Sequence, residues 1–349
     1  MNTYTCRCPT GILNSDGSEN TELVTLPAPN FEKQHTNSNI KVFKCASQVF
    51  SLKGQKGNFG SYVLLACLAG SIGVIVFYAL KGTKQINHIF DDLISIKANP
   101  PKNDSGTDSK KRSVMPEEGK VEGKDDEKKS DVELNEASYE EAEEKDHRSF
   151  LKIYWSFLKM KQLFIFTFYT SIDRNLRVVK IGLFILFISF YFAFTALFFN
   201  DSIMRKIYIY RGNTDAAVHV PNIILSSLCC IIMNFLVNFV SLSNRDMIRA
   251  KNEKNKETVD KIKTWIKVKT FILLGISTLL IALFWYYVSA FCAVFKNSQG
   301  HYFVNVLVAF IVCNLWPCVT SLIPAALRKA GLSKQSSCMY KASKIVYYI

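Results

Sequence analysis

Five long apolar blocks that contain no Asp, Glu, Lys or Arg divide this chain. The blocks are residues 61–80, 181–199, 223–240, 271–295 and 302–324. A hydrocarbon core of about 30 Å requires about 20 helical residues, and a segment in lipid must satisfy its own backbone polar groups. Barrel strands would instead alternate apolar and polar residues over about ten positions, a pattern that the blocks lack. The chain is therefore predicted to be an all-α polytopic membrane protein with about five transmembrane helices.

Basic residues between the apolar blocks predict the orientation of the chain. Lys and Arg are abundant in three segments, with 18 in residues 81–177, nine in 243–270 and five in 328–349. They are sparse in the other three, with six in residues 1–60, three in 200–217 and one in 296–301. Short cytoplasmic loops carry an excess of Lys and Arg. We therefore expect the N-terminus outside and the C-terminus inside, with 1–60 as an extracellular juxtamembrane segment and 328–349 as a cytoplasmic tail.

The long connection after the first block is expected to lack a core of its own. Residues 81–149 are rich in Lys, Asp, Glu, Ser and Gly, and such a composition cannot bury enough apolar surface to fold. It is predicted to be a disordered cytoplasmic linker, although the acidic stretch 133–144 could form a fluctuating helix. Residues 150–172 mix aromatic residues with lysines and predict an interfacial amphipathic helix, with a re-entrant hairpin as the alternative. Residues 173–327 then form a four-helix membrane domain.

A basic cytoplasmic helix is predicted over residues 243–270, directly before the fourth apolar block. It carries nine basic and four acidic residues, and its lysines at 261, 263, 267 and 269 flank a loose apolar stripe. Surface Lys and Arg attract anionic lipid by about 1 kcal/mol each, so Lys261, Lys263, Lys267 and Lys269 are candidate lipid contacts. Setting the topology is the simpler role for the same charges. Nucleic-acid binding is not expected, because the segment has no recognised nucleic-acid-binding fold.

Polar residues recur within the third and fifth apolar blocks. Ser227, Cys230, Asn234 and Asn238 repeat about every 3.5 residues, which places them on one face of a helix, and Asn305 and Asn314 lie in the fifth block. Hydroxyl and amide groups in lipid hydrogen-bond across helices, so one interpretation is contact between helices. The other is a stripe that lines a pore or ligand site, in an oligomeric channel or facilitator.

The apolar blocks contain none of the ionisable residues that coupled transporters, voltage sensors and intramembrane proteases use at depth. The five His residues do not cluster, and no HExxH, GxSxG, Walker A or GxGxxG motif occurs. We therefore expect no enzymatic activity, no catalytic residue, no cofactor and no metal site. Asn200 opens an N-glycosylation sequon in the second outer segment, close to the membrane edge.

Several segments resemble the C-terminal multi-pass region of large Cys-rich surface proteins of protists, an uncharacterised family with EGF-like or furin-like repeats. They are residues 41–65, 242–247, 284–300 and 173–208, the last including Leu197–Ser202 and Lys206–Tyr208. The resemblance covers residues 41–349 and carries no activity or site residue with it. It implies that residues 1–60 are the remnant of a Cys-rich ectodomain. The odd number of outer cysteines and the absence of a signal peptide in the first 30 residues favour the same expectation.

The overall composition is the average of two kinds of segment. The mean hydropathy of +0.10 averages uncharged spans and charged connections, and the net charge of +14 indicates a basic cytoplasmic face that meets lipid. We expect a non-enzymatic membrane anchor of a surface or receptor-like protein, located in the plasma membrane and able to form a homo-oligomer. The alternative is a subunit of a channel or facilitator lined by the third and fifth spans.

Overall fold

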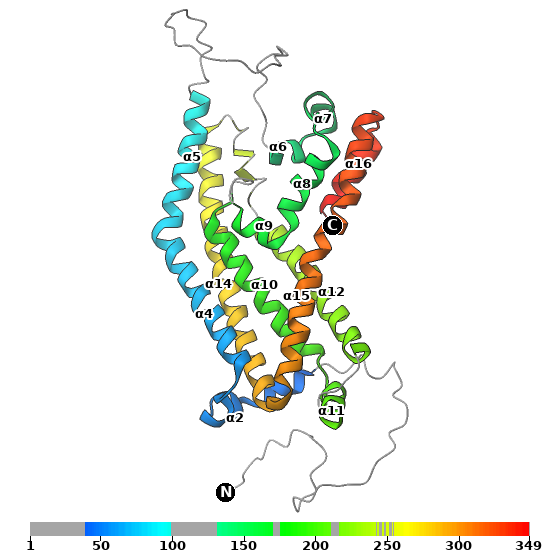
Figure 1. Ribbon diagram of the computed structural model, residues 1–349. Coiled ribbons are helices and arrows are strands. Elements are labelled where there is room, and N and C mark those ends of the chain that lie inside the picture. The colour runs from blue at the N-terminus through cyan, green and yellow to red at the C-terminus, as the bar shows by residue number, and fades with distance from the viewer. Residues whose placement is uncertain are drawn as a thin grey trace, which may run out of the picture.

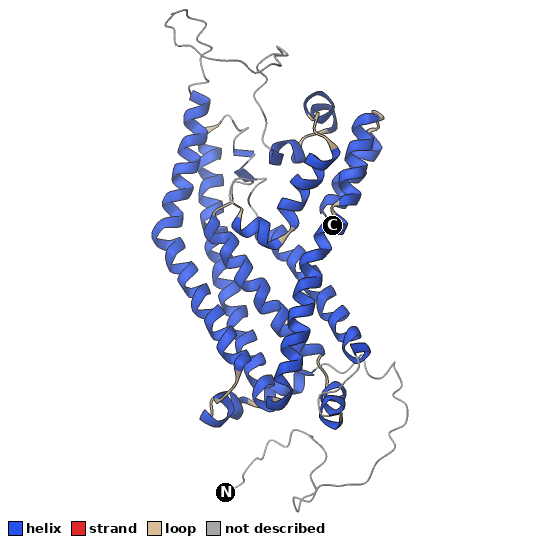
Figure 2. Cartoon of the chain, viewed as in Figure 1, coloured by secondary structure: helices blue, strands red, loops and turns tan. Residues whose placement is uncertain are grey.

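The computed structural model describes residues 39–98, 131–169, 175–210, 216–241 and 255–348, with 243, 246–247, 249–250 and 253. These residues are helical or in loops, and none of those described forms a strand (Figure 2). Five helices are long and apolar enough to cross a membrane: Phe59–Asp91, Arg177–Phe198, His219–Ser241, Lys256–Val294 and Lys296–Ser333. The predicted all-helical fold with five membrane helices is confirmed.

Two of these helices, α4 (Phe59–Phe77) and α14 (Lys256–Val294), run antiparallel along their full apolar length (Figure 1). Polar contacts hold their register: Trp285 Nε1 donates to Ser61 Oγ at 3.2 Å, and the hydroxyls of Ser71 and Thr278 are 2.5 Å apart. Gly60 allows the close approach, because a Cβ at this position would lie 2.6 Å from the Cys292 sulfur.

The central helix of the bundle is α10 (Arg177–Phe198), which contacts α4, α12 (Ala216–Ser241), α14 and α15 (Gln299–Thr320). Aromatic rings fill the space at its end, where Phe199, Phe291 and Tyr302 have centroids 5.0 to 6.2 Å apart. The buried Tyr302 hydroxyl donates to the Phe192 carbonyl at 2.7 Å. Burial of these large side chains is the main stabilising contribution at this end of the bundle.

The first apolar helix continues well past the predicted end of its span. A π-helical turn, η2 (Tyr78–Gly82), joins α4 to α5 (Thr83–Ala98). Tyr78 is buried there, and its hydroxyl donates to the Lys267 carbonyl of α14 at 3.0 Å. The prediction of a disordered linker from residue 81 is therefore wrong for residues 83–98, because Ile86 and Phe90 are fully buried on the face of α5.

A second group of helices, which we call the helical lobe, lies beyond one end of the bundle (Figure 1). It consists of α6 (Asp131–Glu136), α7 (Tyr139–Lys145), α8 (Phe150–Lys161), α16 (Leu322–Ser333) and α17 (Ser337–Tyr348). Disorder is thus also the wrong prediction for residues 131–149, while residues 99–130 lie outside the described part. The predicted tail 328–349 is folded as the end of α16 and α17.

The predicted single helix over residues 150–172 is two helices. Gln162 separates α8 from α9 (Leu163–Phe168), and its side chain caps α9 by accepting from the Ile165 N–H at 2.6 Å. The α8 face with Ile153 and Phe157 is buried within the lobe. The Phe164 ring of α9 instead contacts Phe184 of α10 at 5.6 Å. The interfacial helix and its re-entrant alternative both stay predictions. Residues 170–172 lie outside the described part.

The predicted basic helix over 243–270 is also only partly correct. Its C-terminal half is the start of α14, which begins at Lys256 with Asn255 as the N-cap. The described residues between 243 and 255 do not belong to this helix. The cap explains the boundary, since Asn255 Oδ1 accepts from the Glu257 N–H at 3.0 Å and satisfies an otherwise unpaired donor.

The opposite end of the bundle carries short helical segments (Figure 1). These are η1 (Asn39–Lys44), α2 (Ala46–Val49) and α3 (Leu52–Gln55), with α11 (Asp201–Ile209) nearby. Asn200 is buried, and its Oδ1 accepts from the Ile203 N–H of α11 at 3.0 Å. Glycosylation of Asn200 stays a prediction.

Candidate functional site

The predicted polar face of α12 lies against α10 and α15, and we call this contact the α12 seam. Ser227 and Cys230 are buried in it. Cys313 of α15 donates to the Ser227 carbonyl at 3.5 Å, and Asn234 Nδ2 donates to the Tyr191 hydroxyl of α10 at 3.3 Å. The structure therefore brings these predicted residues to a contact between helices.

The asparagines of the fifth span have different roles in the seam. Asn305 lies 3.1 Å from His219 of α12, measured between Nδ2 and Nδ1. Both this pair and the Cys313–Ser227 pair are separated by 86 residues, which means that α12 and α15 run parallel in a fixed register. Asn314 bonds within its own helix, to the Phe310 carbonyl at 2.8 Å.

The seam also holds buried polar atoms that have no hydrogen-bond partner within the described part of the chain. They are both amide atoms of Asn222, the Ser227 hydroxyl, and Oδ1 of Asn234, Asn238 and Asn314. An unsatisfied polar group in hydrocarbon costs several kcal/mol. Water or a polar ligand in the seam would remove that cost, so the seam is a candidate binding site for water or a polar ligand.

The predicted lipid-binding lysines pair with acidic side chains of the chain itself. Lys261 lies 2.7 Å from Glu257, and Lys263 and Lys269 lie 3.4 Å from Asp91 and Asp246 respectively. The α5 carboxylate of Asp91 thus connects the first and fourth membrane helices. These pairs reduce the positive charge that Lys261, Lys263 and Lys269 present to lipid. The fourth predicted lysine, Lys267, also lies on α14.

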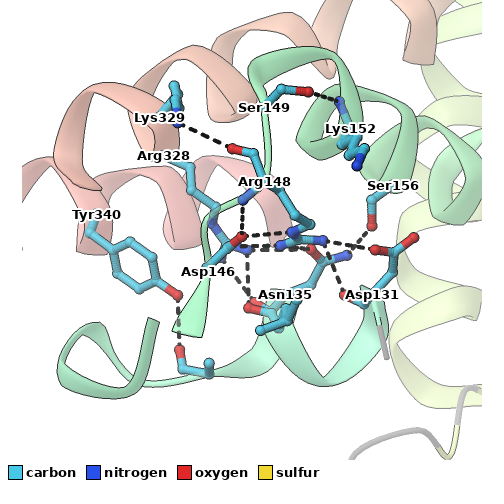
Figure 3. A network of polar contacts seen from close by, with 12 residues as sticks. Asp131, Asn135, Asp146, Arg148, Ser149, Lys152, Ser156, Arg328, Lys329 and Tyr340 are labelled. Carbon is cyan, nitrogen blue, oxygen red and sulfur yellow. Dashed lines mark hydrogen bonds and ion pairs between the residues drawn. The ribbon is translucent and has the colours of Figure 1, made fainter. Parts of the chain in front are cut away.

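The helical lobe is organised around two buried arginines (Figure 3). Arg148 lies between two carboxylates, with Nε 2.7 Å from Asp146 Oδ1 and Nη1 3.3 Å from Asp131 Oδ1. Its Nη2 donates to Asn135 Oδ1 at 3.1 Å, and Asn135 in turn donates to Ser156 of α8 at 2.8 Å. Burial alone would lower the pKa of Arg148, but the hydrogen bonds and charges of Asp146 and Asp131 raise it, so the side chain stays charged.

Arg328 projects from α16 and is fully buried. Its guanidinium donates to the backbone carbonyls of Leu134 at 3.4 Å and of Asn135 at 2.9 Å. The rings of Phe157 and Tyr340 lie on it, each 4.9 Å from the guanidinium carbon. Cation–π contacts of this kind strengthen when water is excluded.

The next two carbonyls at the C-terminal end of α6 are satisfied by α17. Lys344 Nζ donates to the Glu136 and Ala137 carbonyls at 2.9 Å each. The Tyr340 hydroxyl donates to the Ala137 carbonyl at 3.0 Å (Figure 3). The last carbonyls of a helix have no partners within the helix and carry partial negative charge. Donors from α16 and α17 therefore satisfy four successive carbonyls, an arrangement that we call the α6 clamp.

The clamp joins parts of the chain that are far apart in sequence and ties them to the membrane bundle. Arg328 and Asn135 are 193 residues apart, and α16 follows α15 directly after Ser321. A further bond links α8 to α15, from the Tyr154 hydroxyl to the Cys318 carbonyl at 3.0 Å. The lobe is thus joined to α15 by the continuous chain and by a hydrogen bond from α8.

Sequence reasoning did not identify any residue of the α6 clamp. It also did not single out Asp146 or Arg148, which follow the acidic stretch 133–144 and have the composition of solvated charges. The one available signal was Arg328, which with Lys329 interrupts an otherwise uncharged helix that continues from a membrane span. A charge in such a position requires a buried partner.

Comparisons with protein-family models, with curated proteins and with solved structures found no match to this chain. Among the described residues, no group of three His, Cys, Asp or Glu side chains could hold a metal ion. The chain shows five helices suited to a membrane, a polar seam between two of them, and a folded lobe at one end. The geometry supports a multi-pass membrane protein.

Proposed function

We propose that this protein is a non-enzymatic membrane anchor of a surface or receptor-like protein, located in the plasma membrane. The bundle would hold an outer N-terminal segment on one side and present the helical lobe on the other. The observation that carries the proposal is the α6 clamp, because it makes the lobe a folded unit attached to a membrane helix. A folded unit so attached is suited to binding other proteins.

The resemblance to Cys-rich surface proteins of protists supports the same proposal from the sequence side. In that family, extracellular repeats precede a multi-pass region, and here residues 1–60 would take the outer position. The short helices η1, α2 and α3 connect that segment to the bundle through direct hydrogen bonds, such as Gln55 Nε2 of α3 to the Ser289 hydroxyl at 3.1 Å. A rigid connection of this kind favours an anchor.

The topology of the full-length chain tests the proposal in cells. Epitope tags placed at the N-terminus and the C-terminus should differ in access. The N-terminal tag should bind antibody on intact cells, and the C-terminal tag only after the membrane is permeabilised. If both tags are exposed on the same side, or if neither is ever exposed at the cell surface, the anchor proposal is wrong.

A channel or facilitator is the second candidate, and the unsatisfied polar atoms of the α12 seam favour it. The purified chain reconstituted in liposomes distinguishes the two functions. An anchor gives no ion flux above that of empty liposomes. A flux that is lost in the variants Asn234→Leu and Asn238→Leu would reject the anchor and establish the channel, whereas a flux that persists in both would reject the seam as its path.

A further inference from the structure

The segment before α4 exposes apolar side chains in an unusual place. In residues 39–58, Leu52 is 93% exposed and Phe50 is 72% exposed. The opposite face of the segment is buried, with Val42, Cys45 and Val49 each at most 5% exposed. The segment is therefore two-sided: one face packs on the bundle, and the other presents large apolar groups outward.

The buried face fixes the segment at a definite level along α14. The Tyr286 hydroxyl donates to the Phe43 carbonyl at 2.8 Å, and the rings of Phe43 and Tyr287 stack at 4.8 Å. Gln55 Nε2 donates to the Ser289 hydroxyl at 3.1 Å. The segment thus lies beside residues 286–289, before α14 ends at Val294.

This level lies within reach of the hydrocarbon. The uncharged run of α14 begins at Phe271, and at 1.5 Å per residue Tyr286 is about 22 Å and Ser289 about 27 Å further along the axis. A hydrocarbon core is about 30 Å thick. The segment is therefore at the boundary between hydrocarbon and headgroups, not in bulk water.

Two further observations identify lipid as the partner of the outward face. Large rings are exposed again where the first apolar helix begins, with Phe59 63% and Tyr62 50% exposed. Lys53 and Lys56 are exposed beside Leu52, and their ammonium groups match the phosphates of a headgroup layer. Aromatic and basic residues are typical of this layer.

We propose that residues 39–58 lie in the membrane interface, with Phe50 and Leu52 inserted among the phospholipids of the leaflet at the N-terminal end of α4. The inference does not depend on the proposed function, since an anchor and a channel could both carry such a segment. It assigns a lipid-binding surface to a part of the chain outside the five spans.

Photo-crosslinking of the full-length chain in phospholipid nanodiscs tests this proposal. Benzoylphenylalanine is placed at Leu52 or Phe50, where the exposed side chain leaves folding undisturbed. Leu236, which is 48% exposed on α12, serves as the positive control, and the exposed Glu143 of α7 as the negative control. The expected result after illumination is a mass increase of one phospholipid at Leu52, Phe50 and Leu236, and none at Glu143.

Other partners of the face would give other products. A crosslink to residues 1–38 would show that the chain covers its own surface, and a crosslinked dimer would show that a second copy does. Either product, or a lipid yield at both Leu52 and Phe50 no higher than at Glu143, overturns the proposal.

Discussion

The helical lobe and the α12 seam both bury polar side chains, and they differ in how those side chains are satisfied. In the lobe, the last three carbonyls of α6 and the next carbonyl, that of Ala137, have donors from α16 or α17, and Arg148 has two carboxylates. Among the buried polar atoms of the two arginines, Arg328 Nε alone lacks a partner in the described part of the chain. In the seam, Asn222 has no partner for either amide atom within the described residues. A buried network in which every polar group has a hydrogen-bond partner favours one arrangement of the chain. A buried polar group without a partner in the chain can be satisfied by another molecule instead. The lobe is thus held by hydrogen bonds and ion pairs within the chain, whereas the seam keeps buried polar atoms without such partners among the described residues.

The largest effect on this comparison is expected from Arg328→Met. The substitution leaves the Leu134 and Asn135 carbonyls without donors in a buried site, which should cost the lobe about 4 kcal/mol. Native-state hydrogen exchange measures the free energy of opening of the lobe. Lys334→Met, at the exposed C-cap of the same helix, should change this free energy little. Equal stability of the two variants would show that the clamp does not hold the lobe.

Asp146→Asn should have the next largest effect, because Asp146 is buried and carries the shortest ion pair to Arg148. Removing its charge leaves a buried guanidinium with only Asp131, at an expected cost of about 3 kcal/mol. The matched variant Asp131→Asn should cost below about 1 kcal/mol, because that carboxylate is 43% exposed. Proteolysis of the lobe at increasing urea concentration measures the loss in its free energy of unfolding for each variant. Equal losses would show that burial does not determine the strength of these ion pairs.

Within the membrane bundle, Gly60→Ala tests how much the close packing of α4 and α14 contributes to stability. This contribution is separate from the hydrogen bonds compared above. The added methyl would lie 2.6 Å from the Cys292 sulfur and 2.9 Å from Val288, so α4 and α14 must separate, at about 2 kcal/mol. Gly73→Ala is the control, since no atom lies within 4 Å of its added carbon. Thermal unfolding in nanodiscs should separate the two variants, and identical midpoints would contradict the observed approach of the helices.

Substitutions in the α12 seam should change the stability of the bundle only weakly. Asn234→Leu removes the bond to Tyr191, and such bonds between membrane helices are worth about 0.6 to 2 kcal/mol. A double-mutant cycle with Tyr191→Phe measures the coupling directly. A coupling above about 2 kcal/mol would mean that the seam is a structural network like the lobe.

A pH dependence is expected at Lys161 of α8, which lies 5.3 Å from the Tyr347 ring. Burial lowers the pKa of Lys161 to about 8, while the unfolded chain keeps this proton up to about pH 10.4. The unfolded state therefore binds more protons between these values, and the lobe gains stability as pH rises from 8 to 10.4. The wild type should gain stability relative to Lys161→Met over this interval, and parallel curves would reject the assignment.

The five spans were predictable because length and the absence of charge identify them without any knowledge of contacts. The polar face of α12 was also predictable, since Ser227, Cys230 and Asn234 follow helical spacing. Its neighbours Tyr191 and Cys313 were not, because spacing in one helix does not identify the helix it meets. Lys263 and Asp91 illustrate the same limit, as two solvated charges in sequence that form an ion pair in the structure.

The lobe could not be predicted from sequence for a related reason. Residues 131–148 have the composition of a disordered linker, and alone they cannot bury a core. Their partners are Arg328, Tyr340 and Lys344, more than 180 residues further along the chain. Tertiary contacts with α16 and α17 supply both the apolar surface and the donors that the segment lacks.

Hydrogen exchange of α6 and α7 in the full-length protein in nanodiscs is the most direct test of the central claim that a folded lobe is attached to the membrane bundle. The account predicts that backbone amides of residues 134–136 and 142–146 exchange slowly, with protection equal to that of α17. Exchange of these amides at the rate of an unstructured peptide, while the membrane helices stay protected, would contradict it.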